Sequence, residues 1–282
     1  MRDRHRPTKP RPQRPGAWRG SHPQDRRHER RQHSADGPVV LYGWHTVKAA
    51  LANPARRIRR LLATENALRR LSDEGIALPL APEPVRPDAI AAQLSPDAVH
   101  QGLLAEADPL PSPALEDFGA TTGVMLVLDQ ITDPHNVGAI LRTAAAFSVA
   151  AIVTTARHSP DATGVLAKSA SGALEWVPIV AVQNLARALS QLKERGFLIV
   201  GLDSTGADDL AALELAAPLA LVLGAEGKGL RQGTRAHCDR LARLDMPGAI
   251  KTLNVSNAAA LALYIATRAT ATSRRTVEAQ EA

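Results

Sequence analysis

From residue 124 onward, the sequence alternates between short uninterrupted apolar runs and amphipathic segments. An apolar run without polar alternation is typical of a strand buried on both faces, as in parallel sheets. The amphipathic stretch 185–195 has the periodicity of a helix that covers such a sheet. We therefore predict an α/β fold with a parallel sheet covered by helices on both faces. The predicted strands are 124–128, 150–153, 177–182, 197–202 and 219–223.

A smaller α/β unit is predicted in front of this sheet, over residues 38–107. Pro, Ser, Asp and Gly then dominate residues 108–122, which is typical of a linker. The larger domain follows over 123–272, and a short C-terminal tail is expected over 273–282. Within the small unit we predict helices over 44–51, 66–71 and 88–94 and strands over 58–63 and 101–105.

The basic charge of the chain is concentrated in residues 1–37. They hold 11 Lys and Arg against 4 Asp and Glu, a local charge of +7, whereas the whole chain carries +6 and the remaining residues therefore −1. This segment has almost nothing to bury and is predicted to be disordered. Such a basic tail either aids solubility or attracts RNA phosphates, and composition alone favours neither.

Several classes of protein are excluded by what the sequence lacks. Cys238 is the single cysteine, so a disulfide framework is excluded and a reducing, cytoplasmic location is expected. The N-terminus has no apolar core of a secretory signal, and no apolar stretch approaches the roughly 20 residues of a membrane span. His237 and Cys238 lack a third ligand nearby, so no metal is expected. Aromatic residues make up 3% of the chain, too few for a single-strand binder built on stacking.

The first candidate motif, DPHNVGAILR, closely follows the strand predicted at 124–128. Asp133 suits a helix N-cap and Pro134 the first helical position. Arg142 lies off the apolar face of this helix, four residues after Gly138, and we expect the glycine to leave open surface beneath the arginine. Open α/β sheets place ligand sites at this end of their strands. An ordinary capped helix with a solvated arginine has the same pattern.

The second candidate motif, LVLGAEGKGL, spans the end of the strand predicted at 219–223. Its three glycines, starting at Gly224, allow the backbone to approach a ligand closely. The spacing matches neither a P-loop nor the GxGxxG dinucleotide fingerprint, because Glu226 occupies the place of the second glycine. A simple tight turn explains this pattern equally well.

The third candidate motif reads LDMPG followed by TLNVSNAAA. Thr252, Asn254 and Ser256 lie at the entrance of an apolar helix expected over 258–269. Short polar side chains at such a position either cap the helix or orient a ligand.

In this order and spacing, the three motifs resemble those of the SpoU-type RNA 2′-O-methyltransferases of the SPOUT superfamily. The resemblance covers residues 124–268, and the opening YGWHTVKAAL is similar to the ribosomal-protein-L30e-like substrate-binding domain of many SpoU enzymes. The arrangement is most similar to the branch that methylates a guanosine ribose in large-subunit (23S) ribosomal RNA. The resemblance implies a C-terminal trefoil knot, which general rules of chain connection would not suggest.

The resemblance also implies S-adenosylmethionine as the cofactor, held largely by backbone groups. Carried over onto this sequence, the cofactor-binding residues are Gly224, Leu244, Met246 and Leu253. The implied catalytic residues are Asn136, Arg142, Glu226, Thr252 and Asn254. Thr252 replaces the more usual Ser and Asp245 the more usual Pro, which should affect mainly the affinity for the cofactor.

We therefore expect a homodimeric guanosine-2′-O-methyltransferase whose partner is 23S ribosomal RNA, since the superfamily builds its site near a dimer interface. A tRNA ribose methyltransferase is a close alternative, although the preceding small domain favours rRNA. A non-catalytic RNA-binding protein of ribosome assembly is a third interpretation. The joint presence of Asn136, Arg142, Glu226 and Asn254 argues against it, because a pure binder has no need of that set.

Overall fold

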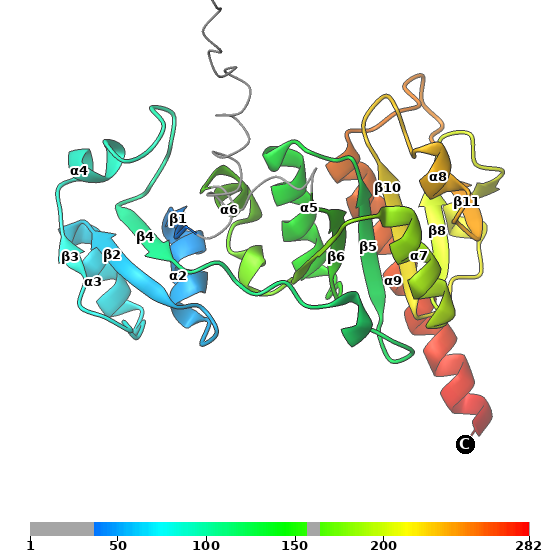
Figure 1. Ribbon diagram of the computed structural model, residues 1–282, viewed down its shortest axis with the longest axis horizontal. Coiled ribbons are helices and arrows are strands. Elements are labelled where there is room, and N and C mark those ends of the chain that lie inside the picture. Colours follow the sequence, from blue (N-terminus) through cyan, green and yellow to red (C-terminus); the bar gives the residue numbers. More distant parts are fainter. Residues whose placement is uncertain (1–36, 157–163, 282) are drawn as a thin grey trace, which may run out of the picture. The chain divides into compact units, whose positions relative to one another are not determined.

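The computed structural model describes residues 37–156 and 164–281 (Figure 1). The basic tail predicted over 1–37 therefore lies outside the described residues, apart from Gly37. Two sheets are present, one within residues 39–107 and the other within residues 124–243. Within the described ranges, no helix is long and apolar enough to cross a membrane.

The N-terminal domain, residues 38–107, contains a four-stranded sheet in the order β1-β4-β2-β3. Its two long pairings, β1 with β4 and β2 with β4, are antiparallel. The strand predicted at 58–63 has these bounds in the structure, whereas β4 begins two residues later than predicted and β1 was not predicted. The elements are β1 (Val39–Tyr42), α2 (Trp44–Ala52), β2 (Ile58–Ala63), α3 (Glu65–Asp73), β3 (Glu83–Pro84), α4 (Pro87–Ala91) and β4 (Leu103–Ala107).

The C-terminal domain contains a seven-stranded sheet in the order β7-β6-β5-β10-β8-β11-β9, and all of its pairings are parallel, as predicted. The strands are β5 (Val124–Asp129), β6 (Ile152–Thr155), β7 (Ile179–Val182), β8 (Leu198–Leu202), β9 (Asp208–Asp209), β10 (Leu219–Gly224) and β11 (Arg240–Arg243). The helices are α5 (Pro134–Ala146), α6 (Gly164–Ala170), α7 (Leu185–Glu194), α8 (Gln232–Arg235) and α9 (Val255–Glu281), with 3₁₀ turns η1 (Leu115–Asp117), η2 (Ala173–Glu175) and η3 (Leu210–Ala212).

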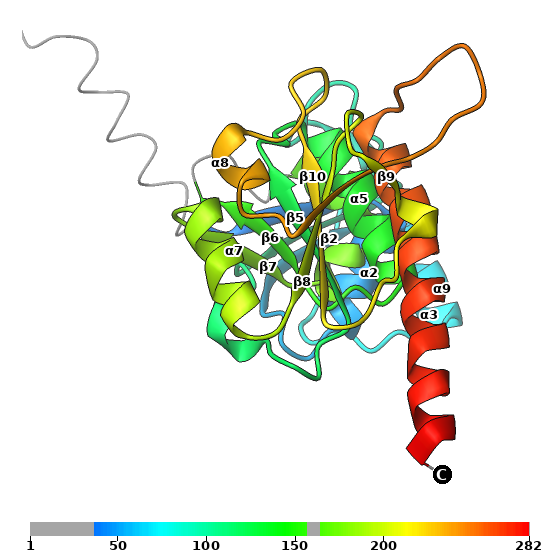
Figure 2. The same ribbon diagram turned by 90° about the vertical axis from the view of Figure 1, so that its right-hand side faces the viewer.

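The sheet is buried on both faces, which explains the uninterrupted apolar runs. Along β5, Leu126 and Leu128 pack into one core with α5, α6 and α9, while Met125 and Val127 pack into a second core with α7. Figure 2 shows α7 and α9 on opposite sides of the sheet. Successive side chains of a strand point to opposite faces, so a strand covered on both sides needs apolar residues at every position.

The observed strands differ from the predicted ones where burial and pairing do not coincide. Strand β6 begins at Ile152 and β7 at Ile179, each two residues after the start of its apolar run. Ala151 and Val177 are buried although they precede these strands. An apolar run marks burial, and strand pairing also requires backbone hydrogen bonds to a neighbour. Strand β11 was not predicted, because its two exposed or half-buried arginines hide the pattern.

The two domains are joined by a buried ion pair and close backbone packing. Arg56 of the N-terminal domain and Glu175 of η2 pair at 2.7 Å, with side chains only 4% and 2% exposed. A Cβ added to Gly172 would lie 2.6 Å from the Cβ of Ala49 in α2. The segment predicted as a linker, 108–122, contains η1, whose Leu115 is buried in the second core. Helix α9 continues to Glu281, through the segment predicted as a C-terminal tail.

Candidate active site at the carboxyl ends of the central strands

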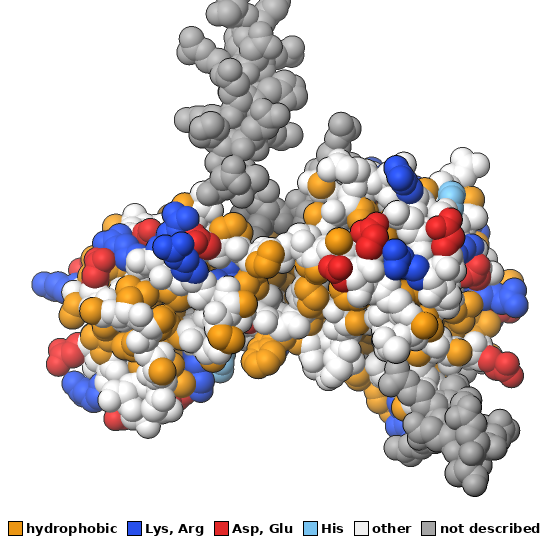
Figure 3. Space-filling view, turned by 60° about the horizontal axis from the view of Figure 1, so that its bottom comes forward, with side chains coloured by type: hydrophobic (Ala, Val, Ile, Leu, Met, Phe, Trp, Pro, Cys, Tyr) orange, Lys and Arg blue, Asp and Glu red, His pale blue; other side chains and the backbone are white. Residues whose placement is uncertain are grey.

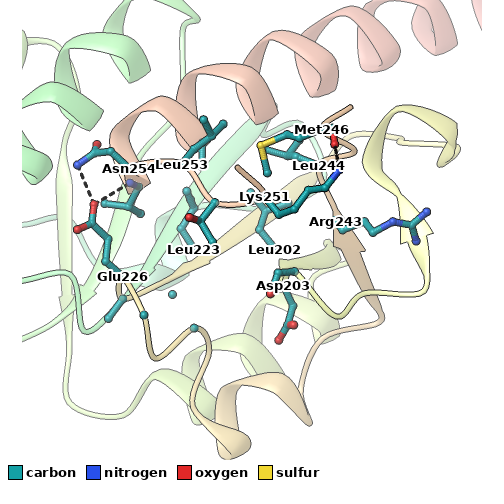
Figure 4. Close-up of a pocket in the computed structure, with 18 of the residues that line it drawn as sticks. Leu202, Asp203, Leu223, Glu226, Arg243, Leu244, Met246, Lys251, Leu253 and Asn254 are labelled. Atoms are coloured by element: carbon teal, nitrogen blue, oxygen red, sulfur yellow. Dashed lines mark hydrogen bonds between the residues drawn. The ribbon is translucent and has the colours of Figure 1, made fainter. Parts of the chain in front are cut away.

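A cavity of about 820 Å³ lies where the loops after β8, β10 and β11 meet the segment that leads into α9 (Figure 4). Gly224, at the end of β10, is in register with Asp129 at the end of the adjacent parallel strand β5, so the segment between β5 and α5 leaves the sheet at the same level. The predicted residues that line the cavity are Gly224, Glu226, Leu244, Met246, Thr252, Leu253 and Asn254. This is the usual position of a ligand site in a parallel α/β sheet.

The first motif forms the N-terminal half of α5, as predicted. The carboxylate of Asp133 accepts a hydrogen bond from the backbone N–H of His135 at 2.9 Å, and Pro134 occupies the first turn. Val137 and Ile140 of the predicted apolar face are buried in the core. The rigid cap fixes where α5 begins, and it thereby fixes the position of Asn136 in the first turn.

Asn254 connects all three motifs by hydrogen bonds. Its Nδ2 donates to Oδ1 of Asn136 at 3.0 Å and to Oε1 of Glu226 at 2.7 Å, while its Oδ1 accepts from the backbone N–H of Ser256 at 2.9 Å. The carboxylate of Glu226 also accepts from the backbone N–H of Val255. Because the Ser256 N–H requires an oxygen and the carboxylate requires a donor, the orientation of this amide is fixed by its neighbours.

The glycines of the second motif let the loop fold back on itself. A Cβ on Gly224 would lie 2.2 Å from the backbone carbon of Gly229, closer than real Cβ atoms ever approach. The Gly229 N–H donates to the carbonyl of Ala225 at 2.8 Å, and Gly227 and Gly229 both have positive φ. Glycine is therefore required here by the turn itself. The turn places Glu226 on the exposed side of the loop, beside α9.

Three of the predicted cofactor-binding residues form an apolar wall of the cavity. Leu244, Met246 and Leu253 line the cavity together with Leu202 and Leu223 (Figure 4). The ammonium of Lys251 donates to the carbonyl of Met246 at 2.5 Å and thereby closes the loop that carries the third motif. Thr252 is exposed at the edge of the cavity.

Arg142 is the one predicted site residue that neither lines the cavity nor joins the hydrogen bonds among Asn136, Glu226 and Asn254. It is exposed on α5, six residues after Asn136, which places it about 9 Å further along the helix axis and on another face. The expectation that Gly138 leaves open surface beneath it is wrong. Gly138 is buried, and a Cβ there would lie 2.3 Å from the Cβ of Ser169, because α6 packs directly against α5.

Sequence reasoning missed two carboxylates near the site. Asp129 is fully buried and accepts from the backbone N–H of Arg231 at 2.9 Å and from its Nε at 2.6 Å, which ties the end of β5 to the segment that follows the glycine loop. Asp203 lines the cavity and pairs with Arg235 at 2.7 Å. Burial raises the pKa of Asp203, but hydrogen bonds from Thr205 and the charge of Arg235 outweigh this effect, so the pKa lies below its usual value. An acidic residue at the end of an apolar run was the available signal for both.

The residue that replaces the usual proline is held by a neighbour. The carboxylate of Asp245 accepts a hydrogen bond from Nε of Arg243 at 2.7 Å, which lowers the pKa of Asp245. Among the described residues, no group of three or more His, Cys, Asp or Glu is placed to hold a metal ion. Burial raises the pKa of the Cys238 thiol to about 11, so it is not a thiolate nucleophile at neutral pH.

Comparison with known proteins identifies the family. The model of the SpoU rRNA methylase family matches residues 123–264, and the model described as RNA 2′-O ribose methyltransferase substrate binding matches residues 40–113. The 23S rRNA (guanosine-2′-O-)-methyltransferase RlmB of Pseudomonas putida is 39% identical over 238 residues, 81% of this chain and 95% of the relative. The enzyme of the same name from Pseudomonas aeruginosa is 40% identical over 238 residues, 79% of this chain and 94% of its own.

Solved structures share the fold across both domains. An RNA 2′-O ribose methyltransferase with 25% identity has a TM-score of 0.72, with 86% of this chain and 93% of the other covered. The SpoU methyltransferase AviRb from Streptomyces viridochromogenes, solved with its cofactor AdoMet, has a TM-score of 0.71 at 23% identity, with 86% and 92% covered, and shows likeness of fold. With a family model matched over residues 123–264 and relatives about 40% identical over most of their own length, this chain belongs to the SpoU rRNA methylase family.

Proposed function

We propose that this protein transfers a methyl group from S-adenosylmethionine to the ribose 2′-hydroxyl of a guanosine in 23S ribosomal RNA. The observation that carries this proposal is the hydrogen-bonded cluster of Asn136, Glu226 and Asn254 at the edge of the cavity. Its three members come from three separate motifs, and relatives named for this activity align over about 95% of their own length.

The cavity suits S-adenosylmethionine in size and in chemistry. Its volume falls within the range of small-molecule sites. Leu223, Leu244 and Leu253 offer apolar contact to an adenine ring, and the carboxylate of Asp203 can accept hydrogen bonds from hydroxyl or ammonium groups. Gly224 and Met246 would complete the binding site through backbone and side-chain contacts. When bound, this cofactor supplies an electrophilic methyl group.

The residues of the cluster bind and orient the ribose. Glu226 has its second carboxylate oxygen outside the hydrogen bonds to Asn254 and Val255, which leaves it to accept a hydrogen bond from a ribose hydroxyl. Thr252 places a hydroxyl at the same edge of the cavity. Positioning of this kind supplies much of the rate enhancement in a transfer that requires an in-line approach.

Arg142 acts as a cationic clamp rather than as a base. A guanidinium keeps its protons at neutral pH. Its planar donor groups suit bidentate binding of an RNA phosphate and stabilisation of negative charge that develops on the 2′-oxygen.

The protein acts as a homodimer in which Arg142 of one chain serves the cavity of the other. Support comes from the position of Arg142 away from the Asn136 cluster of its own chain. The exposed apolar residues Leu261 and Tyr264 on α9 provide a surface for a second copy. The test mixes two inactive variants, Arg142→Ala and Glu226→Gln. Mixed dimers should recover activity because one site holds both intact residues; no recovery after subunit exchange would contradict the shared site.

Two finer features of the fold belong to this proposal, namely a trefoil knot in the C-terminal domain and an L30e-like N-terminal domain. An enzyme that modifies 23S rRNA is also expected in the cytoplasm, where its substrate is. Figure 3 shows basic and acidic side chains interspersed on one face of the molecule, so RNA recognition there depends on placed residues rather than on a uniformly basic surface.

Mapping of 2′-O-methyl groups on rRNA and tRNA tests the activity. Deletion of the gene should remove one guanosine mark from 23S rRNA, and the wild-type gene should restore it while Arg142→Ala should not. An unchanged rRNA profile with a missing tRNA mark would overturn the proposal in favour of a tRNA enzyme. Arg142→Ala should retain its affinity for S-adenosylmethionine, which separates loss of turnover from loss of cofactor.

A further inference from the structure

A second cavity, of about 600 Å³, lies entirely within the N-terminal domain. Its walls are the start of α2, the first two turns of α3, the start of α4 and the loop 98–102 that leads into β4. It shares no lining residue with the cavity at the ends of the C-terminal strands. The side chains that carry the argument are Trp44, Asn66, Arg70, Val99 and His100.

Arg70 forms a rigid flat platform in this cavity. Its guanidinium carbon lies 3.7 Å from the centroid of the Trp44 ring, and Trp44 as a whole is only 3% exposed. Nε of Arg70 donates to Glu74 at 3.1 Å, and Glu74 is held in turn by Lys48. The Arg70 side chain nevertheless remains 55% exposed, so one face of the guanidinium rests on tryptophan and the other is open. A guanidinium plane with an open face is a known stacking partner for an unstacked RNA base.

Polar groups that can read the edge of a base stand beside this platform. Nδ1 of His100 accepts from the backbone N–H of Gly102, so the proton of the neutral ring is on Nε2, which is left as a donor. The amide of Asn66 is exposed and has no hydrogen-bond partner among the described residues. Val99, 64% exposed, adds an apolar surface at the edge of the cavity. A flat cation, two edge-reading groups and an apolar wall together match the chemistry of a nucleobase.

Within the described part of the chain, one cation and no carboxylate line this cavity. Arg70 is the only Lys or Arg among its described lining residues, and its partner Glu74 does not line the cavity. The active-site cavity contains three carboxylates, Asp203, Glu226 and Asp245, and two cations, Arg243 and Lys251.

The loop that borders the cavity is anchored to the catalytic domain. Oε1 of Gln101 accepts from the backbone N–H of Trp44 and from Nζ of Lys168 in α6, each at 3.0 Å. Gly102 has φ +80, and a Cβ there would lie 2.4 Å from Oγ1 of Thr64. An RNA segment held in this cavity is therefore held at a fixed position relative to α6 and α5.

We propose that the Trp44–Arg70 cavity binds one unpaired base of the RNA substrate, stacked on the open face of Arg70 and read by Asn66 and His100. This subsite rests on the proposed RNA methyltransferase activity and assigns a position of substrate contact remote from the methylated ribose. It selects the substrate, while the motif residues carry the chemistry.

The test uses the full chain and a synthetic 23S rRNA hairpin that the wild-type enzyme methylates. Arg70→Ala should raise the KM for this RNA between about fivefold and 150-fold, the loss of one base-stacking contact, with kcat and cofactor affinity unchanged. Arg70→Lys should lose most of the same affinity, because it keeps the charge but not the plane. The matched control is Arg69→Ala, which removes the same charge from the neighbouring, outward-facing position and should change KM less than about threefold.

An abasic scan of the hairpin identifies the bound base and separates direct contact from a structural effect. One abasic position should raise the wild-type KM as much as Arg70→Ala does, and it should add no further loss in that variant. If every abasic penalty persists in full in Arg70→Ala, or if Arg70→Ala retains the wild-type KM, the subsite is refuted. These results differ from failure of the proposed function, in which the wild-type enzyme itself would not methylate any 23S rRNA fragment.

Discussion

Replacement of Glu175 by Gln tests the contact between the two domains. The Glu175 carboxylate accepts from Nε and Nη2 of Arg56 at 2.7–3.2 Å and from Nδ2 of Asn53 at 2.8 Å. Nη1 of Arg56 donates to the carbonyl of Asp108 at 2.8 Å. The variant leaves the Arg56 guanidinium buried without its counter-charge, because both side chains are less than 5% exposed.

The loss follows from this burial. Removal of one partner of a buried ion pair costs about 3–5 kcal/mol, mostly the uncompensated charge that remains. In proteins of about 150–250 residues each kcal/mol lowers Tm by roughly 2–4 °C, so Glu175→Gln should lower Tm by about 6–20 °C. The double variant Arg56→Met, Glu175→Leu replaces the pair by apolar contacts, and it should recover most of this loss. Scanning calorimetry gives both values.

The control is Glu65→Gln, which breaks the exposed Arg69–Glu65 pair and should leave Tm unchanged. If Glu175→Gln lowers stability by less than about 1 kcal/mol, water reaches the pair and the reasoning from burial fails. A calorimetric trace that splits into two transitions in this variant would show that the ion pair couples the unfolding of the two domains.

Three further predictions concern the active site and the tail. Gly224→Ala should lower the affinity for S-adenosylmethionine at least tenfold in titration calorimetry, since its Cβ would collide with Gly229, whereas Gly233→Ala, with nothing within 4 Å, should not. Asp203 has a lowered pKa in the folded state, so its contribution to stability is complete above the unfolded value near 3.9 and is lost as pH falls through the folded one. Asp203→Asn should therefore lose less stability than the wild type when the pH falls below about 5. If both proteins lose the same stability over this pH range, the contribution attributed to Asp203 is wrong. A variant that starts at Pro38 lacks the 11 Lys and Arg of residues 1–37, so it should methylate the same nucleotide but bind RNA with a shallower salt dependence. A change of the methylated nucleotide would show that this segment selects the site of methylation.

Much of the fold was predictable because it depends on local pattern. The five predicted strands of the large domain are present in a parallel sheet, since a strand buried on both faces must be apolar at every position. Asp133 was recognisable as a cap because capping requires only residue type and neighbours in sequence. The strand β11 was not predicted because two of its four residues are arginines, which do not form an apolar run. Backbone pairing with β8 makes this segment a strand, and that pairing cannot be recognised from the local pattern.

The sequence alone determined which residue types carry the chemistry and in what order they occur. Only the tertiary structure decided which of them meet. Asn254 contacts Glu226 across 28 residues and Asn136 across 118, and both contacts depend on β5 and β10 being neighbours in the sheet. Gly138 was expected to leave open surface on α5, but it lies where α6 packs against α5. Local propensity and periodicity are properties of a segment, whereas these contacts depend on strand order and register, which only the folded chain establishes.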